Sequence, residues 1–470
     1  MEKYYANILS EFIYDLDFDK IPSPVLQKAK VSILDNLGLA VGGSDSKATQ
    51  AVLSVVRLLN GPKESTVFRF GDQLSANYAV LANGTMTHSN DFTDTILTIV
   101  THCGPVVVPT AIAMAEREKL DGKALLTLVV LGYDIAARVG LAINSKPSMV
   151  HHKKGFHPTS TCGVFGAAAI AGKALGLKPD KIAHALGIAG SSSSGLCESL
   201  TGPTGADTSR THPGKAGHDG ILAALLAKSG LTGPHSVFEG RDGFLHAYSE
   251  ADQFLPHLLV ENLGESFKIM DVAIKYHNGT HAIASSADAL QEIVAKYQIL
   301  PEDVGEIRAF IPTMHAFIGG SDQEAMYAPP TYIKAQMSLP YTLAITLLDG
   351  ELFLEQYSPE KLSDQKTLSL ARKVKITADQ EMDRMQNEGK WPSRIQVVTK
   401  SGNSYEAFVE YPKGSPQNPL TDLELQRKFN RLSGKSLNKK QREGIIEAVN
   451  GLETLKEVTA LTRLMIQLIQ

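Results

Sequence analysis

The sequence contains little cysteine and almost no tryptophan. Its three cysteines, Cys103, Cys162 and Cys197, are too few and too odd in number for a disulfide framework. Such sparse use suits a reducing compartment, and the first residues, MEKYYANILSEF, resemble neither a signal peptide nor an Arg-rich transit peptide. Aromatic residues make up only 7% of the chain, with the single Trp391, so small residues must fill much of the core. We therefore expect a cytoplasmic protein with closely packed helices.

The chain also lacks a strong excess of charge and a long apolar run. It has 50 acidic and 46 basic residues, so its formal net charge of −4 indicates no surface for nucleic acid or for an anionic membrane. No run of about 18 apolar residues occurs, and the most apolar stretch, residues 124–131, soon meets Asp134 and Arg138. These two residues lie four apart and are expected to pair on one helix face. Neither nucleic acid nor a membrane is an expected partner.

The pattern along the chain predicts more than one domain. A length of 470 residues corresponds to two or three domains at roughly 150 residues each. Residues 1–266 have helical patterns almost throughout, whereas residues 267–412 mix helices with short alternating strands. Residues 413–470 begin with a linker rich in Pro and Gly and continue as amphipathic helices. We predict a mainly α protein: a large all-helical domain, a smaller α/β domain inserted before the C-terminal helices, and C-terminal helices that return to the large domain.

Local signals make this prediction specific. Residues 161–175 are rich in Gly and Ala, and Gly disfavours a helix by up to about 1 kcal/mol relative to Ala. This segment therefore belongs where another backbone approaches closely. A strand is predicted over 305–311, a helix over 334–348, and a hairpin over 394–411 with a Ser-Gly-Asn turn.

The common nucleotide and catalytic fingerprints are missing. The sequence has no G-x-x-x-x-G-K-[ST] loop, no G-x-G-x-x-G after a predicted strand and no G-x-S-x-G elbow. It has no H-E-x-x-H or C-x-x-C pair that would indicate a metal site. The remaining signals are histidines, acids and hydroxyls in loops.

Two segments carry candidate acid–base groups. Asp91 and Thr95 are four apart and would share a face of a helix, with His102 soon after. A carboxylate there could accept a proton and a hydroxyl could hold a substrate carboxylate, although helix capping by Asp91 and Asp94 is an equally good interpretation. His157 precedes a helix N-terminus, where carboxylates bind well, and the alternative is a structural histidine.

Further polar residues follow along the chain. Ser209, Arg210 and Lys215 surround a His-Pro-Gly turn that opens a helix, and they either bind an anion or form a solvated basic turn. His281 lies at the expected domain junction. Tyr341 follows a proline, and burial of its ring is at least as good an interpretation as a catalytic role. Together these residues suggest proton chemistry on an anionic acid.

Motifs in this order resemble the MmgE/PrpD family, which includes 2-methylcitrate dehydratase, cis-aconitate decarboxylase and iminodisuccinate epimerase. The motifs are NDFTDT at 90–95, GFHPT at 155–159 with TCGVFG at 161–166, ALGIAGS at 185–191, HPGKA at 212–216 and AQMSLPY at 335–341. The resemblance implies a large helical domain, a smaller α/β lid domain with a cleft between them, a homodimer and chemistry without a cofactor. It assigns active-site roles to Asp91, Thr95, His102, His157, His281 and Tyr341. Members often carry a lysine three residues before the histidine of the His-Pro-Gly turn, and here that position is Ser209, with Arg210 next to it.

The resemblance implies a small di- or tricarboxylic acid as substrate and proton transfer next to one of its carboxylates. Dehydration of a 2-methylcitrate-like acid is the leading expectation, with decarboxylation of cis-aconitate and epimerisation of iminodisuccinate as alternatives. Two other classes stay open. One is an iron–sulfur hydratase held by the three cysteines, although no two of them are closely spaced. The other is a non-catalytic polycarboxylate-binding protein.

Overall fold

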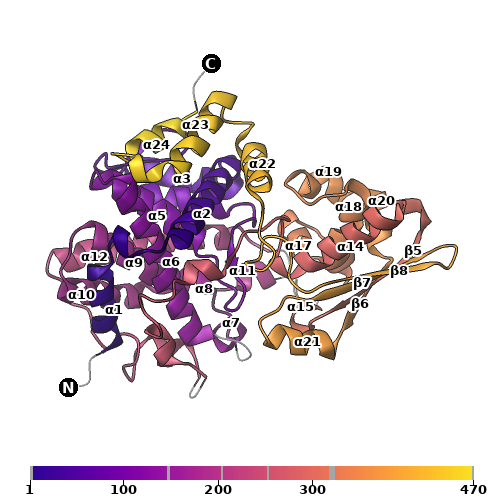
Figure 1. Ribbon diagram of the computed structural model, residues 1–470, viewed down its shortest axis with the longest axis horizontal. Helices are drawn as coiled ribbons and strands as arrows, with labels where there is room; N and C mark the ends of the chain where they lie inside the picture. The colour runs from indigo at the N-terminus through magenta and orange to yellow at the C-terminus, as the bar shows by residue number, and fades with distance from the viewer. Residues whose placement is uncertain (1–3, 145–148, 203–204, 251–252, 317–322, 468–470) are drawn as a thin grey trace.

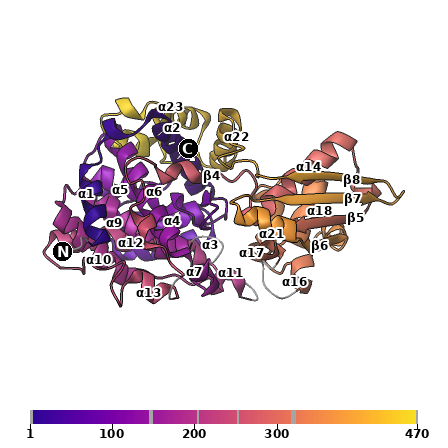
Figure 2. The same cartoon turned by 60° about the horizontal axis from the view of Figure 1, so that its bottom comes forward.

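The computed structural model describes residues 4–144, 149–202, 205–250, 253–316 and 323–467, and it has two lobes (Figures 1 and 2). One hydrophobic core contains residues from Ala6 to Ile274 and from Leu425 to Met465, and a second core contains residues from Ile283 to Ala407. We call the first lobe the helical body and the second the α/β unit. The predicted mainly α fold with a small sheet region is confirmed, whereas the predicted boundaries at 266 and 412 stay a prediction.

The helical body is built around one helix of small residues. Its main helices are α1 (Tyr5–Asp15), α2 (Ser23–Gly42), α3 (Lys47–Leu59), α4 (Ala76–His88), α5 (Gly104–Arg117), α6 (Gly122–Asn144), α9 (Gly163–Ala174), α10 (Pro179–Ser192) and α12 (Thr208–Lys228). The helix α9 packs against α5, α6, α10 and α12. A Cβ atom at Gly166 would lie 2.7 Å from the carbonyl oxygen of Gly132, so α9 approaches α6 at a distance that only glycine permits. The prediction of a closely approached small-residue helix is therefore confirmed.

The long helix α6 is held in the body by a buried ion pair. Arg138 Nε donates to Asp134 Oδ2 over 2.7 Å, and both side chains are fully buried. The same guanidinium donates to the backbone oxygens of Glu261 and Ser266, which ties α6 to the segment that follows the body helices. The helix is long and apolar enough to cross a membrane, but 94% of its most apolar window is buried inside the protein. That burial is typical of a core helix.

The α/β unit contains a four-stranded sheet in the order β6-β5-β7-β8. Its strands are β5 (Val304–Ile311), β6 (Val374–Ala378), β7 (Ser393–Thr399) and β8 (Ser404–Val409). Strands β5 and β6 are parallel, the other pairs are antiparallel, and the β7–β8 hairpin aligns Ser393 with Val409. Helices α14 (Ala284–Tyr297) and α18 (Leu339–Asp349) pack on this sheet. The predicted strand at 305–311 and the hairpin are confirmed.

The predicted helix over 334–348 is wrong, because the segment forms two helices. The first, α17, spans Tyr332–Gln336, and α18 begins at Leu339. Met337 is the C-cap of the first helix, and Ser338 caps the second, since its hydroxyl oxygen accepts from the backbone N–H of Tyr341. Pro340 lies in the first turn of α18, where its missing N–H costs nothing, so it starts a helix instead of kinking one.

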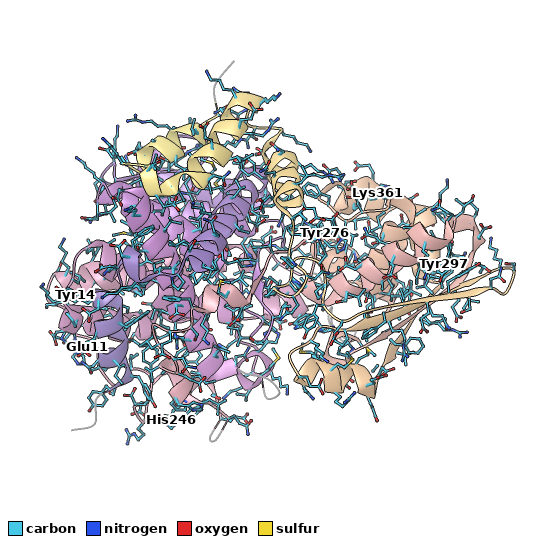
Figure 3. All side chains as sticks on the ribbon, viewed as in Figure 1. Glu11, Tyr14, His246, Tyr276, Tyr297 and Lys361 are labelled. Atoms are coloured by element: carbon cyan, nitrogen blue, oxygen red, sulfur yellow. The ribbon has the colours of Figure 1, made fainter. Side chains whose placement is uncertain are left out.

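The chain leaves the body and returns to it along neighbouring paths. It passes from one lobe to the other near Tyr276, which lies between them in Figure 3. The N–H of Ile274 donates to the carbonyl oxygen of Gly414 over 2.8 Å, so the outgoing and returning strands of the connection are paired. Helix α22 (Asp422–Ser433) then packs on α2, followed by α23 (Lys439–Asn450) and α24 (Thr459–Leu464). A short ribbon of β3 (Thr95–Ile96) and β4 (Val272–Ala273) lies beside this connection.

Candidate active site

A cavity of about 290 Å³ lies where the helical body meets the α/β unit. Six residues singled out from the sequence line it: Asp91, Thr95, His102, His157, Arg210 and His281. The other lining residues are His88, Val100, Met149, His152, Cys197, Leu200, Thr201, Lys275, Thr280, Met314, Met337 and Trp391. Side chains that lie far apart in the sequence, from His88 to Trp391, therefore converge on one place.

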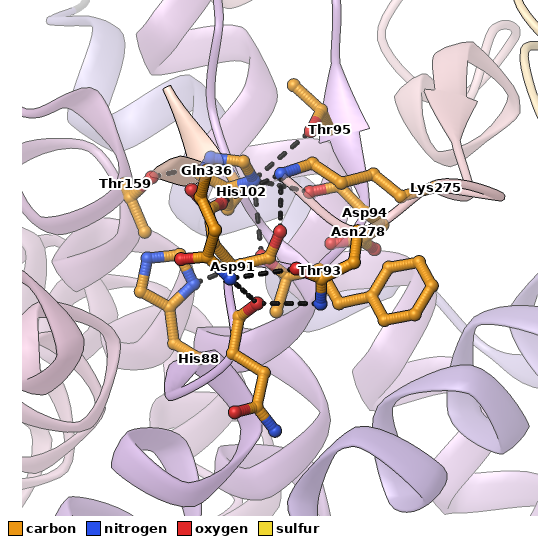
Figure 4. A network of polar contacts seen from close by, with 12 residues as sticks. His88, Asp91, Thr93, Asp94, Thr95, His102, Thr159, Lys275, Asn278 and Gln336 are labelled. Carbon is orange, nitrogen blue, oxygen red and sulfur yellow. Dashed lines mark hydrogen bonds and ion pairs between the residues drawn. The ribbon is translucent and has the colours of Figure 1, made fainter. Parts of the chain in front are cut away.

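Asp91 lies at the centre of the polar side of this cavity (Figure 4). Lys275 Nζ donates to its Oδ1 over 2.8 Å, and the guanidinium of Arg210 lies 3.9 Å from its Oδ2. Burial opposes ionisation of the carboxyl, but Lys275 and Arg210 outweigh burial and hold the pKa of Asp91 well below its usual range. Asp91 is therefore ionised at neutral pH and is a weak base until other anions neutralise its two cations.

Asp91 and Thr95 do not share a helix face, because the segment between them is not helical. Asp91 has a φ of +49°, in the left-handed region, and the chain around it forms a turn. Thr95 belongs to β3, opposite Ala273 of β4. The turn brings the Asp91 carboxylate beside Lys275, which follows β4. Both residues still line the same cavity, but the β3–β4 ribbon places them there, with no shared helix face.

His102 has a defined tautomer. Its Nδ1 lies 2.7 Å from the backbone carbonyl oxygen of Asp94, and because a carbonyl oxygen only accepts, Nδ1 carries the proton. Thr95 Oγ1 lies 3.1 Å from the same nitrogen. Burial, with Lys275 nearby, lowers the pKa of His102 to about 4. His102 is thus a neutral imidazole whose Nε2 has a free lone pair on the cavity side, as a general base requires.

The Asp94 carbonyl that orients His102 is itself held in place. Asp94 Oδ1 accepts from the backbone N–H of Gly104 over 3.0 Å at the start of α5, and Oδ2 accepts from the hydroxyl of Tyr133. Burial raises the pKa of Asp94 to about 6. Neither aspartate is the N-cap residue of a helix: Asp94 accepts from the first N–H of α5, whose N-cap is Cys103, and the carboxylate of Asp91 contacts Lys275.

Two further histidines, His88 and His157, lie beside His102, and His212 lies behind His157. The ring centroids of His88 and His102 lie 5.1 Å apart, and those of His102 and His157 lie 6.3 Å apart. His157 Nδ1 lies 2.9 Å from Nδ1 of His212, so one of these two nitrogens donates to the other. Burial lowers the pKa of both His88 and His157 well below the usual range. The cavity is therefore lined by several neutral imidazoles, and the negative charge of a bound carboxylate would raise their pKa values.

His281 faces the cavity from the other lobe. Neither of its ring nitrogens has a hydrogen-bond partner among the residues that the structure describes, although the side chain is only 5% exposed. Its ring lies edge-on to Trp391, with centroids 5.8 Å apart. A buried imidazole without a polar partner costs free energy, which a ligand in the cavity would recover.

Arg210 joins the two lobes at the cavity. Its second terminal nitrogen donates to Oε1 of Gln336 over 2.9 Å, and Gln336 Nε2 donates to the backbone oxygen of Asn90 over 2.8 Å. Arg210 is 1% exposed, and its other terminal nitrogen has no hydrogen-bond partner within the described ranges. This cation is therefore available to a carboxylate in the cavity.

Three sequence-predicted residues do not line the cavity. The hydroxyl of Tyr341 donates to the backbone oxygen of Gln356 over 2.8 Å within a small cluster of the α/β unit. Ser209 is buried beside Ala206, and Lys215 pairs with Asp219 one helical turn away on α12. The structure does not bring these three residues to the cavity, because Tyr341 packs into its own lobe and Arg210 is the residue of α12 that lines the cavity.

Sequence reasoning missed Lys275 and did not single out His88 as a site residue. Lys275 directly precedes the Tyr276-His277 pair, and His88 ends α4 just before the Asp91 turn. A search for cations beside known polar motifs would have found Lys275. The methionines and Trp391 carried no signal, since apolar residues in isolation are usually interpreted as core.

The three cysteines do not form a ligand set in the described part of the chain. All three are buried free thiols. The one group of three potential metal ligands found there with atoms within 4.8 Å of one another is Asp180, His184 and His235, which contains no cysteine. Nothing in the geometry supports an iron–sulfur cluster on these residues.

The fold and the cavity define a class of protein: a helical body joined to an α/β unit, with a cavity lined by histidines, Asp91, Lys275 and Arg210 at their junction. Residues 7–257 match the MmgE/PrpD N-terminal domain and residues 277–454 match the MmgE/PrpD C-terminal domain. The chain belongs to the MmgE/PrpD family and is an enzyme of that type.

Three relatives cover nearly the whole chain. Cis-aconitate decarboxylase of Homo sapiens is 28% identical over 480 residues, 99% of this chain and 95% of that protein. The enzyme of the same name from Mus musculus is 27% identical, over 99% of this chain and 94% of that protein. Cis-aconitate decarboxylase of Aspergillus terreus is 25% identical, over 96% and 94%.

Proposed function

We propose that this enzyme is a lyase or isomerase that transfers a proton at a carbon next to a carboxylate of a small di- or tricarboxylic acid. Decarboxylation of cis-aconitate is the first activity to test. The observation that carries the proposal is the His102 imidazole, whose Nδ1–H is engaged with Asp94 and whose Nε2 is left for the cavity. The two cations beside Asp91 supply the means of binding carboxylates.

The geometry suits decarboxylation of a β,γ-unsaturated acid. The bond between the CH₂ carbon and its carboxylate breaks, and the double bond shifts as CO₂ leaves. The carbon next to another carboxylate then takes a proton. Lys275 and Arg210 would bind the carboxylates that remain, and an imidazolium at His102 would deliver the proton. His102 is neutral in the free enzyme, so substrate anions must first raise its pKa.

Dehydration of a 2-methylcitrate-like acid, the leading expectation from the sequence, now ranks second. The relatives reported above are decarboxylases by name, and the same residues could remove an α-proton for dehydration or epimerisation. The cytoplasmic location and the homodimer stay predictions.

Proton NMR in D₂O with cis-aconitate, 2-methylcitrate and iminodisuccinate tests the proposal. We expect a new product carrying deuterium next to a carboxylate with at least one of these acids. The Lys215→Ala variant should behave like the unmodified enzyme, because Lys215 does not line the cavity. Absence of both turnover and deuterium exchange with all three acids would overturn the proposal.

A further inference from the structure

One side of the cavity is lined by apolar side chains, which contribute nothing to the binding of carboxylate groups. We call Val100, Met149, Leu200, Met314, Met337 and Trp391 the apolar wall. Val100, Met149 and Leu200 come from the helical body, and the other three come from the α/β unit. On the polar side, in contrast, Lys275 and Arg210 lie beside Asp91, and His88 lies beside His102.

The methionines of the apolar wall do not pack in a core. Met149, Met314 and Met337 belong to none of the hydrophobic clusters found in the described part of the chain. Met149 is nevertheless only 3% exposed, so it faces the cavity instead of bulk water. Methionine side chains adapt their shape to the surface they cover, which suits a flexible apolar group. Val100 and Trp391 pack with Leu97, Ala273 and Ala282, so the three methionines are the part of the wall for which the described residues provide no hydrophobic cluster.

Backbone strain holds part of this wall in position. Val100 has a φ of +50° and Met149 a φ of +43°, in the left-handed region that non-glycine residues rarely adopt. Such a conformation costs on the order of 1–3 kcal/mol and persists where the surrounding structure requires it, often at ligand sites. Asp91, at the polar side, has the same feature. The fold thus maintains strained residues on both the charged and the apolar sides of one cavity.

Charge limits how many carboxylates the cavity can neutralise. Lys275 and Arg210 contribute two positive charges and Asp91 one negative charge, so with neutral histidines the net charge is 2 − 1 = +1. The valine, leucine and methionine side chains of the wall offer no N–H or O–H donor, so a carboxylate placed against them would lose its hydration without gaining a hydrogen bond. The wall is therefore suited to the carbon skeleton of a ligand, while its carboxylates lie at Lys275 and Arg210.

We infer that the substrate carries an alkyl or aryl substituent, seated on the apolar wall, in addition to the carboxylates held by Lys275 and Arg210. This inference rests on the proposed function, because it concerns the substrate class of the same site. It predicts that substituted di- or tricarboxylic acids bind more tightly than cis-aconitate or other unsubstituted acids.

Titration calorimetry with succinate, methylsuccinate, butylsuccinate and benzylsuccinate tests the inference on the intact enzyme. Each methylene that leaves water should raise the affinity about fourfold, corresponding to about 0.8 kcal/mol. We expect butylsuccinate and benzylsuccinate to bind far more tightly than succinate. Equal affinities across the series would overturn the inference.

A polar residue of similar shape tests the wall directly. Met337→Gln should reduce the preference for butylsuccinate over succinate about fourfold or more, the effect of one buried methylene. Met270→Gln is the matched control, since Met270 is 40% exposed and lies outside the cavity. Met314→Gln, on a different element, serves the same test if the first variant does not fold. An unchanged preference in the folded wall variants would contradict the inference.

The two proposals fail in different ways. Deuterium exchange or turnover of cis-aconitate together with no gain from substituents would leave the proposed function intact and remove the inference. Tight binding of butylsuccinate that Met337→Gln weakens, with no turnover or exchange of any carboxylic acid, would support the apolar wall and remove the proposed function.

Discussion

His102 Nδ1 donates to the backbone carbonyl oxygen of Asp94 over 2.7 Å, and this contact decides which ring nitrogen can react. The Asp94 carboxyl is held by the N–H of Gly104 and the hydroxyl of Tyr133, so the carbonyl has a fixed position. The proton must therefore reside on Nδ1 in the neutral ring, and Nε2 is left for the cavity. A second residue thus orients the proposed acid–base group through its backbone.

His102→Asn should remove the chemistry while keeping this contact. The asparagine amide can donate to the Asp94 carbonyl as Nδ1 does, but it offers nothing in place of Nε2. We expect kcat to fall by roughly 10²–10⁴-fold, the usual contribution of a positioned acid–base group, with little change in KM. Steady-state kinetics beside Lys215→Ala as control measures this effect. Turnover within tenfold of the unmodified enzyme would exclude His102 from proton transfer.

Asp91→Asn should destabilise the free enzyme as well as slow it. Its carboxylate is the ion-pair partner of the buried Lys275, and breaking a buried pair by removing one partner costs about 3–5 kcal/mol. Urea denaturation would show this loss in the free energy of unfolding. The double variant Asp91→Asn with Lys275→Met should recover part of it, because no unpaired charge then remains. An unchanged unfolding free energy in Asp91→Asn would mean that the pair is not formed.

Arg210→Ala should act on binding more than on the chemical step. Arg210 lies beside Asp91 and donates to Gln336, and its remaining terminal nitrogen can meet a substrate carboxylate. A hydrogen bond to a charged group contributes about 1.5–3 kcal/mol, so KM should rise roughly 10–100-fold. Steady-state kinetics separates this from an effect on kcat. A loss confined to kcat would instead indicate that Arg210 acts only in the transition state.

The Tyr341→Phe variant tests whether Tyr341 has the active-site role that the family resemblance implies or only the structural role that its contacts indicate. Because the hydroxyl of Tyr341 donates to the Gln356 carbonyl outside the cavity, we expect kcat to change by less than about threefold. The free energy of unfolding should fall by about 1 kcal/mol for the lost hydrogen bond. Kinetics and denaturation on one preparation test both statements. A fall in kcat of about 10²-fold or more would return Tyr341 to the catalytic residues.

Stability should fall as the pH decreases from about 6.5 to about 4. Burial lowers the pKa values of His102, His151 and His212 to about 4, below their usual value of 6.5. The unfolded chain therefore binds more protons in this window, and the stability present above pH 6.5 is lost toward pH 4. Asp94 opposes this trend, because its raised pKa of about 6 means that the folded state binds its proton first. Urea denaturation at several pH values measures the net effect of the histidines and Asp94 on stability. A urea midpoint that stays constant between about pH 6.5 and about pH 4 would contradict the predicted loss of stability.

The sequence alone determined the elements that local patterns control. The hairpin at β7–β8, the strand β5 and the small-residue helix α9 follow from turn residues, alternation and glycine content, which act over a few positions. Asp91, His102, His157, His281 and Arg210 were also identified from their sequence contexts, and all of them line the cavity. Their catalytic roles stay predictions.

Only the tertiary structure decided which of the candidate residues meet. Tyr341, Ser209 and Lys215 looked equivalent to the others in sequence, yet packing turns them away from the junction. Lys275 reaches Asp91 across 184 positions of the chain, through the β3–β4 ribbon and the left-handed turn at Asp91. Contacts of this range depend on how whole helices and strands pack, and no local preference encodes them. The sequence thus determined the kinds of groups available for proton transfer, and long-range packing determined which of them share one cavity.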